Sequence, residues 1–515
     1  MQEMRSALVP RHERHMCQLR VRGFGEEKEL QLGKGALISR GVSEKMWHVP
    51  KLKEACGVVG MCTPGPVAEY IYFGLRILQH RGQESAGISV FEDGKHTIVK
   101  GMGLVHQVMK KEQLSHLKGT RGIGHVRYST FGVSALQNVQ PFVVQTTNGE
   151  VSLGHNGEIV NAEAMRTDLK KKGWAFMTSS DSEIIVRLLA NELSIHGDPV
   201  KSIKNLMGLI DGSYSLTIMI GDRVFGVRDP YAIRPLCIGR INNGWAIASE
   251  SVVFDNLDGE FVRDVEGGEI VEVTCEGPRS WKVPSPKEKA HCMFEWVYFA
   301  RPDSTIDGQL VFDVRKRIGR RLAKEHPVEA DAVIPIPDSG RAHALGFAEM
   351  SGIPMAEGLM KNRYVERTFI MPDPNEREMG VMLKLNPIKK EVEGKRIVIL
   401  DDSIIRGTTM RQIVQILRKA GAKEVHVRIG SPPVIAPCYL GIDMKTRHQF
   451  VASNRTVDEI AKVLTADSLG YLSVEGLVEC IGLGDRNLCL GCLTGEYPMS
   501  IEGERTRFQK KIDSF

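Results

Sequence analysis

The sequence predicts an α/β protein of two domains, the first built on layered sheets and the second on a parallel sheet. Short alternating strands and polar turns over Phe225–Ile238 and Trp245–Ser251 are typical of layered sheets. The unbroken apolar run Ile397–Leu400 favours a strand buried on both faces, as in a parallel sheet. Between Glu276 and Lys289, prolines lie among charged residues without an apolar period, so we expect the domain boundary there.

Length and composition limit the classes of function. The chain has 515 residues, 42% hydrophobic and 25% charged, which is enough for two or three domains with their own cores. Its net charge of +5 is small, and no basic block is interleaved with aromatics, so nucleic acid is not an expected partner. No apolar run approaches the roughly 18 residues of a membrane span. The ten cysteines are unevenly spaced, which favours thiols or metal ligands of a reducing, cytoplasmic compartment.

The stretch Arg396–Thr409 (RIVILDDSIIRGTT) has the order of parts that a phosphate site requires. An acidic pair ends the predicted strand, a polar turn with a glycine follows, and apolar residues at helical spacing continue to Gly421. A helix N-terminus offers free N–H donors and the positive end of the helix dipole, so this turn can bind an anion. The carboxylates would meet ribose hydroxyls, directly or through hydrated Mg²⁺. An isolated acidic pair would more simply cap the helix, but the whole stretch favours the phosphate site.

This stretch resembles the loop of type I phosphoribosyltransferases that binds 5-phosphoribosyl 1-pyrophosphate (PRPP). The resemblance implies that the acidic pair lies along the ribose and that the turn surrounds the 5-phosphate. The loop residues expected to bind PRPP are Asp401, Asp402, Ser403, Arg406, Gly407, Thr408 and Thr409.

A second turn, Asp338–Arg341, follows the short β-rich run Ala332–Pro337 and precedes an alanine-rich helix. It resembles the pyrophosphate loop of the same transferases. Backbone N–H groups and Arg341 suit that anion, and Ser339 would complete an Mg²⁺ site with Asp401 and Asp402. A plain turn is the alternative.

Residues 361–384 are rich in charge and proline, and they resemble the mobile loop that closes over PRPP and excludes water. Arg367 and Lys384 are the cations expected to bind PRPP. The segment Asn375–Met379 is less basic than the family pattern, and Met382 stands where a cation is common. Which cation meets the pyrophosphate is therefore left open.

Cys56 opens a set of five motifs in the first half of the chain. Alone, a cysteine before a strand would be a buried and inert thiol. The segments that follow it are LQHRGQESAG at 78–87, GHVRYSTFG at 124–132, GHNGEIVN at 154–161 and SSDSEII at 179–185. Together they resemble class II glutamine amidotransferase domains, whose mature chain begins at the cysteine. The resemblance implies an N-terminal nucleophile (Ntn) fold with αββα layers.

The chemistry of amide hydrolysis accounts for these residue types. A cysteine at a free N-terminus carries its own base, because an α-amino group titrates near pH ~8 and can accept the thiol proton. Asn156 and Gly157 can donate hydrogen bonds to the oxyanion. By resemblance, Arg127 would bind the α-carboxylate of glutamine and Asp181 its α-ammonium. An ordinary salt bridge is the alternative for each, and His155 is interpreted as structural.

Residues 1–55 lack the apolar core of a signal peptide and are not acid-poor like a transit peptide. We interpret them as a leader that is removed to expose Cys56, although Met46 offers a second possible start. The predicted organisation is a leader at 1–55, a class II glutamine amidotransferase (Ntn) domain at 56–285, a type I phosphoribosyltransferase domain at 286–500 and a charged tail at 501–515.

The cysteines predict one further site. Cys489 and Cys492 form a CxxC motif, and Cys292 and Cys438 lie far upstream, a spacing compatible with zinc, an iron–sulfur cluster or no metal. These contexts resemble the iron–sulfur branch of the glutamine PRPP amidotransferases, which implies a structural or oxygen-sensitive [4Fe–4S] cluster. The cysteines without such a context are expected to be ordinary thiols: Cys17, Cys62, Cys237, Cys275 and Cys480.

From Cys56 onward, the chain resembles the glutamine PRPP amidotransferase family. The resemblance implies a pentosyltransferase that makes 5-phosphoribosylamine, glutamate and pyrophosphate from glutamine, PRPP and water, at the start of purine nucleotide synthesis. A homotetramer and feedback by purine nucleotides are also implied. One alternative is another class II amidotransferase, which would lack the PRPP loop. The other is a PRPP-sensing regulator, which should carry a DNA-binding domain in place of the Cys56 motifs.

Overall fold

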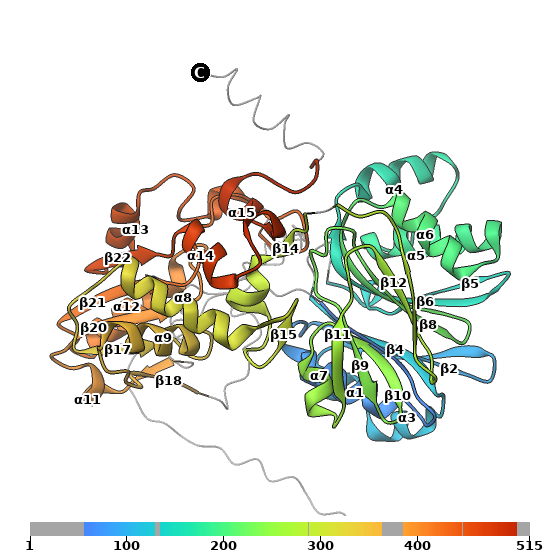
Figure 1. Ribbon diagram of the computed structural model, residues 1–515, viewed down its shortest axis with the longest axis horizontal. Helices are drawn as coiled ribbons and strands as arrows, with labels where there is room; N and C mark the ends of the chain where they lie inside the picture. Colours follow the sequence, from blue (N-terminus) through green and yellow to red (C-terminus); the bar gives the residue numbers. More distant parts are fainter. Residues whose placement is uncertain (1–55, 129–133, 287, 363–384, 445, 502–515) are drawn as a thin grey trace, which may run out of the picture. The chain divides into compact units, whose positions relative to one another are not determined.

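The computed structural model of the chain describes residues 56–128, 134–286, 288–362, 385–444 and 446–501 (Figure 1). The predicted leader and the loop cations Arg367 and Lys384 lie outside the described residues, as does the tail from residue 502. The described residues belong to one compact unit. Among them, no helix has both the length and the apolar character that crossing a membrane requires.

Two antiparallel sheets occupy the first half of the chain. The seven-stranded sheet has the order β11-β9-β10-β1-β4-β2-β3 and the six-stranded sheet the order β13-β12-β8-β7-β6-β5. The first contains β1 (Gly57–Cys62), β2 (Ser85–Glu92), β3 (Lys95–Met102), β4 (Arg121–Arg127), β9 (Cys237–Ile241), β10 (Gly244–Ala248) and β11 (Glu260–Asp264). The second contains β5 (Phe142–Thr146), β6 (Gly149–Ile159), β7 (Gly212–Ile220), β8 (Arg223–Arg228), β12 (Glu269–Val273) and β13 (Pro278–Lys282).

Strand β1 shows how the layers form, because its side chains alternate between two cores. Val59 and Met61 pack against the helices outside the seven-stranded sheet, whereas Val58 and Cys62 pack between the two sheets. The outer helices of this sheet are α1 (Ala68–Ile77), α2 (Val105–Val108), α3 (Lys111–His116) and α7 (Val252–Asn256). Those of the six-stranded sheet are α4 (Ala162–Lys171), α5 (Asp181–His196) and α6 (Pro199–Leu209). The predicted αββα arrangement is confirmed.

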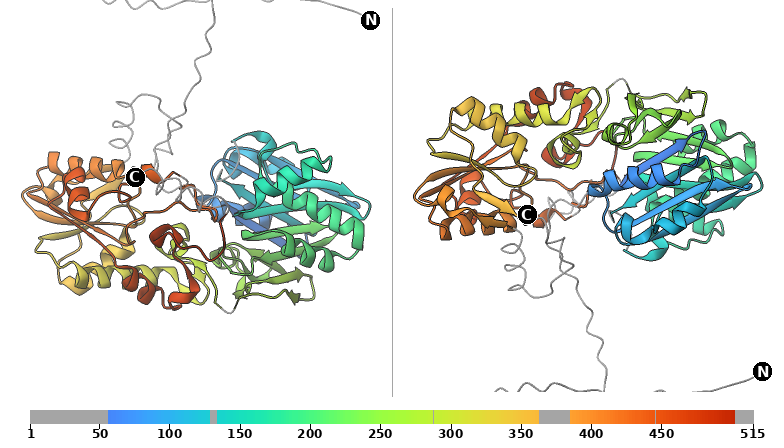
Figure 2. Two further views of the ribbon diagram at one scale, coloured as in Figure 1. Left: turned by 90° about the horizontal axis from the view of Figure 1, so that it is seen from above. Right: turned by 90° about the horizontal axis from the view of Figure 1, so that it is seen from below.

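A four-stranded parallel sheet forms the second half, with the order β17-β20-β21-β22. Its strands are β17 (Ala332–Pro335), β20 (Arg396–Asp401), β21 (Glu424–Ile429) and β22 (Ser468–Tyr471). Val398 and Leu400 pack toward α8 (Val311–Glu325), α9 (Arg341–Ser351) and α14 (Val474–Ile481). Ile397 and Ile399 pack toward α12 (Thr408–Lys419) and α13 (Val457–Leu464). Helices therefore cover both faces (Figure 2), as the sequence predicts for the apolar run.

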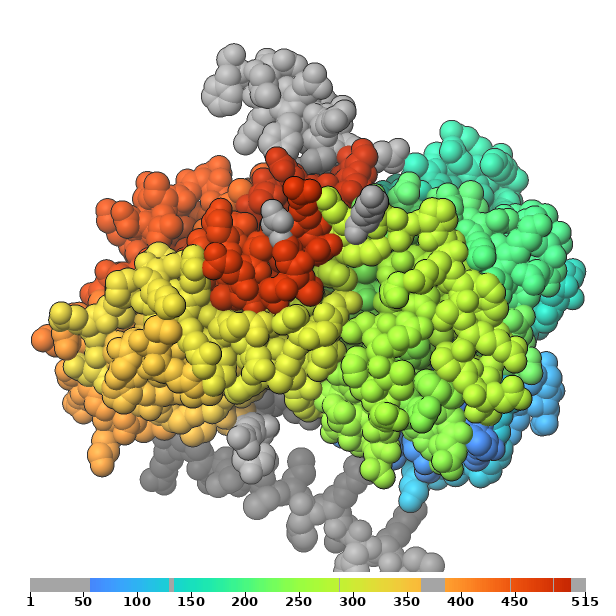
Figure 3. All heavy atoms as spheres, in the orientation of Figure 1, coloured from blue at the N-terminus to red at the C-terminus, as the bar shows by residue number. Residues whose placement is uncertain are grey.

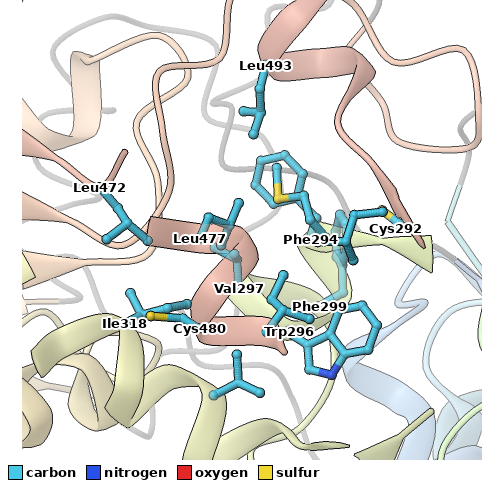
Figure 4. Close-up of a cluster of buried hydrophobic side chains, with 14 of the residues drawn as sticks. Cys292, Phe294, Trp296, Val297, Phe299, Ile318, Leu472, Leu477, Cys480 and Leu493 are labelled. Atoms are coloured by element: carbon cyan, nitrogen blue, oxygen red, sulfur yellow. The ribbon is translucent and has the colours of Figure 1, made fainter. Parts of the chain in front are cut away.

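The segment after Cys292 differs from its predicted conformation. The sequence CMFEWVYFARPDS at Cys292–Ser304 predicts an apolar and aromatic strand followed by a turn. Instead, only β14 (His291–Cys292) is extended there, and a π-helix, η3 (Glu295–Phe299), follows it. Trp296 and Val297 point into a buried cluster (Figure 4). The strand prediction was wrong because a short continuous apolar run does not distinguish a buried strand from a buried helix.

Strand β14 also pairs with the C-terminal part of the chain. It lies parallel to β23 (Leu488–Cys489), with Cys292 directly opposite Cys489. In the space-filling view (Figure 3), the C-terminal residues in red lie at the surface beside residues in yellow and yellow-green. Two cysteines about two hundred positions apart are thus brought into register by one short parallel pair.

Strand β13 lies inside the stretch that the sequence marks as the domain boundary. It is an edge strand, paired only with β12, and most of its residues are exposed or half-buried, so it shows no apolar period. The six-stranded sheet ends at Lys282, and the boundary after residue 285 stays a prediction. The remaining short elements are η1 (Leu78–His80), η2 (Leu136–Asn138), β15 (Thr305–Ile306), β16 (Gln309–Leu310), β18 (Leu359–Lys361), β19 (Leu385–Pro387), α11 (Lys389–Val392), η4 (Arg447–Gln449), η5 (Asp485–Asn487) and α15 (Gly491–Thr494).

Candidate functional site

Cys56 lies directly before β1 and is buried, with 7% of its surface exposed. Its Sγ donates a hydrogen bond to the carbonyl oxygen of Tyr128 at 3.5 Å. Burial raises the pKa of the Cys56 thiol, and the positive charge of Arg127 counteracts that shift. The thiol therefore needs a base to act as a nucleophile at neutral pH, which agrees with the proposed use of the α-amino group.

The two residues predicted to stabilise an oxyanion lie near the end of β6. Asn156 is fully buried, and neither polar atom of its side chain has a hydrogen-bond partner among the described residues. An unsatisfied buried amide costs about 1–3 kcal/mol. Gly157 has a φ of +148°, and a Cβ there would lie 2.0 Å from the Ser213 carbonyl oxygen, so the position requires glycine. The side-chain N–H groups of Asn156 are therefore available to donate a hydrogen bond to a ligand atom.

The charged residues predicted to hold glutamine are buried near Cys56. Arg127 contacts Glu84 with an Nη1–Oε1 distance of 2.5 Å, and both side chains are largely shielded from solvent. Asp181 is the first residue of α5, where its Oδ1 accepts from the Ser182 N–H at 2.8 Å. Arg127, Glu84 and Asp181 all act electrostatically on the Cys56 thiol. The structure thus brings the predicted cation and anion close to Cys56, and it adds Glu84, for which the sequence predicts no role.

His155 is buried beside this group. Its Nδ1 lies 3.0 Å from the Ser182 hydroxyl, and its backbone N–H donates to Gln140 Oε1 at 2.7 Å. Burial lowers the pKa of His155. These contacts agree with a structural role for a neutral imidazole.

Arg81 holds the backbone at Cys56, the predicted nucleophile, although the sequence analysis predicts no function for Arg81. Its Nε donates to the Cys56 carbonyl oxygen at 3.2 Å, and its Nη1 and Nη2 donate to Glu250 at 2.6 Å and Glu295 at 2.7 Å. Burial lowers the pKa of Arg81, but the carboxylates of Glu295 and Glu250 outweigh burial and raise this pKa above its ordinary value. The sequence signal that could have identified Arg81 is its place in the motif at 78–87.

The contacts continue from Glu295 into the second half of the chain. Arg234 Nη1 donates to Glu295 Oε1 at 3.2 Å, and Arg234 Nη2 donates to the Leu440 carbonyl oxygen at 2.8 Å. Arg81, Arg234 and Glu295 are each at most 1% exposed. A continuous buried network therefore connects Cys56 with the π-helix and with the segment next to Cys438.

A pocket lies where β20 ends. Its lining consists of Tyr298 and every residue from Asp401 to Met410, so the structure brings together all the loop residues predicted to bind PRPP. Gly407 has a φ of +79° and precedes α12, and no side chain caps this helix N-terminus. The first N–H groups of α12 are therefore suited to an anion. Tyr298 was missed because the aromatic run that contains it was interpreted as a strand.

The acidic side of this pocket contains the predicted Mg²⁺ ligands. Ser339 Oγ donates to Asp401 Oδ1 at 3.2 Å, and Ser403 Oγ donates to Asp402 Oδ1 at 2.5 Å. Oxygen ligands of this kind fit Mg²⁺. In the described parts of the chain, no three His, Cys, Asp or Glu side chains are close enough to hold an ion together. An Mg²⁺ ion here would take further ligands from water or substrate, as this ion commonly does.

Among the described residues that are predicted to bind an anion, Arg341 does not lie in the pocket lining. Its Nη1 and Nη2 lie 2.5 Å and 3.2 Å from the two carboxylate oxygens of Glu357. Both side chains are over 40% exposed, and Arg341 is not part of the pocket lining. Its role in pyrophosphate binding stays a prediction.

The four cysteines predicted to bind a cluster come from three parts of the chain and lie near one another, but among the described residues no three of them are close enough to hold an ion together. Three of them are buried (Cys292, Cys438 and Cys492), and Cys489 is half-buried. Burial raises the pKa of Cys492 well above its ordinary value, and the other three thiols raise it further. Burial raises the pKa of Cys489 to about 12. The Leu440 N–H donates to Cys438 Sγ at 3.4 Å. Shielded sulfur ligands with amide donors fit an iron–sulfur cluster.

Comparisons with known proteins agree with this geometry. Residues 125–256 match the family described as glutamine amidotransferase domain, and residues 312–429 match the phosphoribosyl transferase domain family. The amidophosphoribosyltransferase of Methanocaldococcus jannaschii is 53% identical over 468 residues, which cover 87% of this chain and 99% of that relative. The chain belongs to the amidophosphoribosyltransferase family.

Further relatives of the amidophosphoribosyltransferase family support the assignment. The enzyme of Methanothermobacter thermautotrophicus is 48% identical over 463 residues, covering 89% of this chain and 98% of that relative. The solved structure of B. subtilis glutamine PRPP amidotransferase, complexed with ADP and GMP, matches with a TM-score of 0.82 and 44% identity. It covers 87% of this chain and 98% of that one. The family resemblance and the two-domain fold class are confirmed.

Asn156→Ala should lower kcat for glutamine hydrolysis by about 10²–10³, with KM changed by less than about threefold, because the lost donor acts on the oxyanion. Steady-state glutaminase assays measure both constants. The matched control is Asn205→Ala on α6, whose side chain bonds to Glu192 away from the nucleophile. A raised KM with unchanged kcat would contradict the oxyanion role.

Glu295→Gln should lower the free energy of unfolding by about 3–5 kcal/mol, because two buried guanidinium groups lose part of their counter-charge. It should also lower glutaminase kcat, since Arg81 holds the Cys56 carbonyl. Urea unfolding measures the first effect. Glu349→Gln removes an exposed partner of Lys316 and Arg320 and should leave the urea midpoint unchanged. Equal urea midpoints for Glu295→Gln and Glu349→Gln would show that the buried network around Glu295 does not stabilise the fold.

Proposed function

We propose that this protein is a glutamine-dependent amidophosphoribosyltransferase, a pentosyltransferase that makes 5-phosphoribosylamine, glutamate and pyrophosphate from glutamine, PRPP and water. One observation carries the proposal: one compact unit contains a buried cysteine, Cys56, a buried Asn156 amide without a partner among the described residues, and a pocket lined by a loop that resembles the PRPP loop. The names of the relatives agree with it. The reaction is the first committed step of de novo purine nucleotide synthesis.

The first half reaction is hydrolysis of the glutamine side-chain amide. The free α-amino group of Cys56 accepts the thiol proton, and the thiolate attacks the amide carbon. Asn156 and Gly157 donate hydrogen bonds to the resulting oxyanion, which collapses as the C–N bond breaks. The leaving nitrogen takes the proton and departs as ammonia, and water then hydrolyses the thioester to glutamate and restores the thiol. Arg127 and Asp181 hold the two charged ends of the amino acid.

The second half reaction takes place in the pocket after β20. The turn from Ser403 to Thr409 and the N-terminus of α12 bind the 5-phosphate, and Asp401 and Asp402 face the ribose. Ammonia attacks C1 of PRPP, a C–N bond forms, and the bond from C1 to the pyrophosphate oxygen breaks. Ser339, Asp401 and Asp402 would hold Mg²⁺, which neutralises charge on the pyrophosphate when bound. The loop with Arg367 and Lys384 is proposed to cover this site and exclude water.

We further propose a [4Fe–4S] cluster on Cys292, Cys438, Cys489 and Cys492. What supports it is that the thiols of Cys292, Cys438 and Cys489 all act electrostatically on Cys492, although they come from distant segments. The Leu440 N–H donates to Cys438 Sγ, and Arg234 lies near Cys292 and Cys438. The cluster would hold these segments together, which is a structural role. No step of the reaction depends on it.

Regulation, assembly and location are further parts of the proposal. The B. subtilis relative was solved with ADP and GMP bound, which supports feedback by purine nucleotides in this chain. A homotetramer and removal of the leader at 1–55 rest on the family resemblance. The described cysteines are free, which fits a reducing, cytoplasmic compartment.

The two sites should be separable by mutation. Asp401→Asn should abolish PRPP-dependent formation of pyrophosphate while basal glutaminase activity remains, and Cys56→Ala should abolish release of glutamate. Coupled assays for glutamate and pyrophosphate on the same preparations measure this. Asp458→Asn, an exposed change on α13, should leave both activities intact. Equal loss of both activities in Asp401→Asn would refute separate sites, and absence of PRPP-dependent glutamate release from the unaltered protein would refute the function.

Protein purified without oxygen should be brown and should contain about four iron and four sulfide per chain, the composition of one [4Fe–4S] cluster. Metal analysis and absorption spectroscopy measure both. Cys489→Ser should lower the iron content, whereas Cys480→Ser, a change at a cysteine outside the group of four, should not. A colourless, active protein loaded with zinc would refute the cluster.

A further inference from the structure

Two cysteines outside both sites and outside the group of four have neighbouring sulfur atoms. The Sγ atoms of Cys62 and Cys275 lie 3.2 Å apart, although 213 positions separate them in the sequence. Cys62 is the last residue of β1, is 2% exposed and packs between the two antiparallel sheets. Cys275 follows β12 and is exposed to solvent. The pair therefore has one shielded and one accessible sulfur.

The backbone on each side of this pair is fixed by hydrogen bonds. Cys62 lies opposite Trp245 of β10 and Arg121 of β4 in the sheet register. On the other side, the Thr274 hydroxyl donates to the Gly277 carbonyl oxygen at 2.8 Å, and the Gly277 N–H donates back to that hydroxyl at 3.2 Å. Central strand pairing and a closed turn thus hold the two sulfurs close together.

We propose that Cys62 and Cys275 form a reversible disulfide site whose oxidant is a small organic disulfide of the glutathione class. A disulfide requires an S–S distance of about 2.05 Å, so the sulfurs have to approach by roughly 1 Å. Rotation of the exposed Cys275 side chain can supply that movement. The sequence alone predicts ordinary thiols at Cys62 and Cys275. Their proximity depends on the packing of two sheets, which no local pattern in the sequence reveals.

The reaction proceeds by two exchanges. The Cys275 thiolate attacks one sulfur of the oxidant, whose S–S bond breaks and releases the first small thiolate. The Cys62 sulfur then attacks the Cys275 sulfur of the mixed disulfide, the second small thiolate leaves, and it takes the proton of Cys62. One organic disulfide is reduced to two thiols while the protein pair is oxidised.

The shielding of Cys62 sets the order of these steps. Burial, together with the neighbouring Cys275, raises the pKa of Cys62 to about 12. Cys62 is therefore protonated at neutral pH and does not react first with the oxidant. Cys275 is the sulfur that the oxidant reaches.

The bond would join the end of β1 to the turn after β12. These strands belong to different sheets, and β1 starts at the residue after Cys56. A crosslink between residues 213 positions apart closes a long loop, which strongly reduces the conformational entropy of the unfolded chain. Oxidation is therefore expected to stabilise the first domain without adding a group to either site.

The test uses the full-length protein under anaerobic conditions. The protein is incubated with oxidised glutathione, alkylated, digested without reduction and analysed by mass spectrometry. We expect a peptide that joins Cys62 to Cys275, two hydrogen masses below the sum of its parts, and its loss after reduction with a phosphine. The oxidised protein should also unfold about 5 °C higher than the reduced protein.

Variants separate this site from other thiols. Cys275→Ser should remove both the crosslinked peptide and the thermal shift. Cys237→Ser is the matched control, because Cys237 is also 2% exposed and lies in the same sheet as Cys62, and it should retain both. A persistent glutathione adduct on Cys275 without a crosslink, or a crosslink from Cys275 to a different cysteine, would overturn the proposal.

Discussion

The guanidinium group of Arg81 is the contact on which the position of Cys56, the proposed nucleophile, depends. It is shielded from solvent, where an unpaired charge would cost several kcal/mol, and it is stable there because Glu250 and Glu295 accept its hydrogen bonds. Its remaining N–H holds the Cys56 carbonyl oxygen. Glu295 also accepts from Arg234, so the backbone at the nucleophile is connected to residues that pack with the transferase half. The start of β1 is therefore positioned by contacts with distant segments as well as by its own strand pairing.

Both sites keep hydrogen-bond donors ready for negative charge that only a substrate brings. At the first site, the buried Asn156 amide has no partner among the described residues. At the second, the N-terminus of α12 after Gly407 carries no side-chain cap. Each arrangement offers donors that the described side chains do not occupy, and each is suited to an oxyanion or a phosphate. Their occurrence in one chain connects release of nitrogen with its use.

Local patterns in the sequence predicted much of the fold and the site. The apolar run at 397–400, the acidic pair and the glycine turn follow from strand periodicity and turn chemistry, and the motifs around Cys56 identified the first domain. Non-local packing was not predictable. The π-helix at Glu295–Phe299 was taken for a strand, and the partners of Arg81 lie 169 and 214 positions away. The exposed pairing of Arg341 with Glu357 and the approach of Cys62 to Cys275 likewise depend on elements that no local pattern connects.

The central claim is that catalysis begins at a cysteine whose own α-amino group is its base. That claim requires the chain ahead of Cys56 to be absent from the active protein. Intact-mass and N-terminal peptide mass spectrometry on purified protein with measured glutaminase activity tests it most directly. The account predicts a mature chain that starts at Cys56. Full activity in protein that retains residues ahead of Cys56 would contradict it.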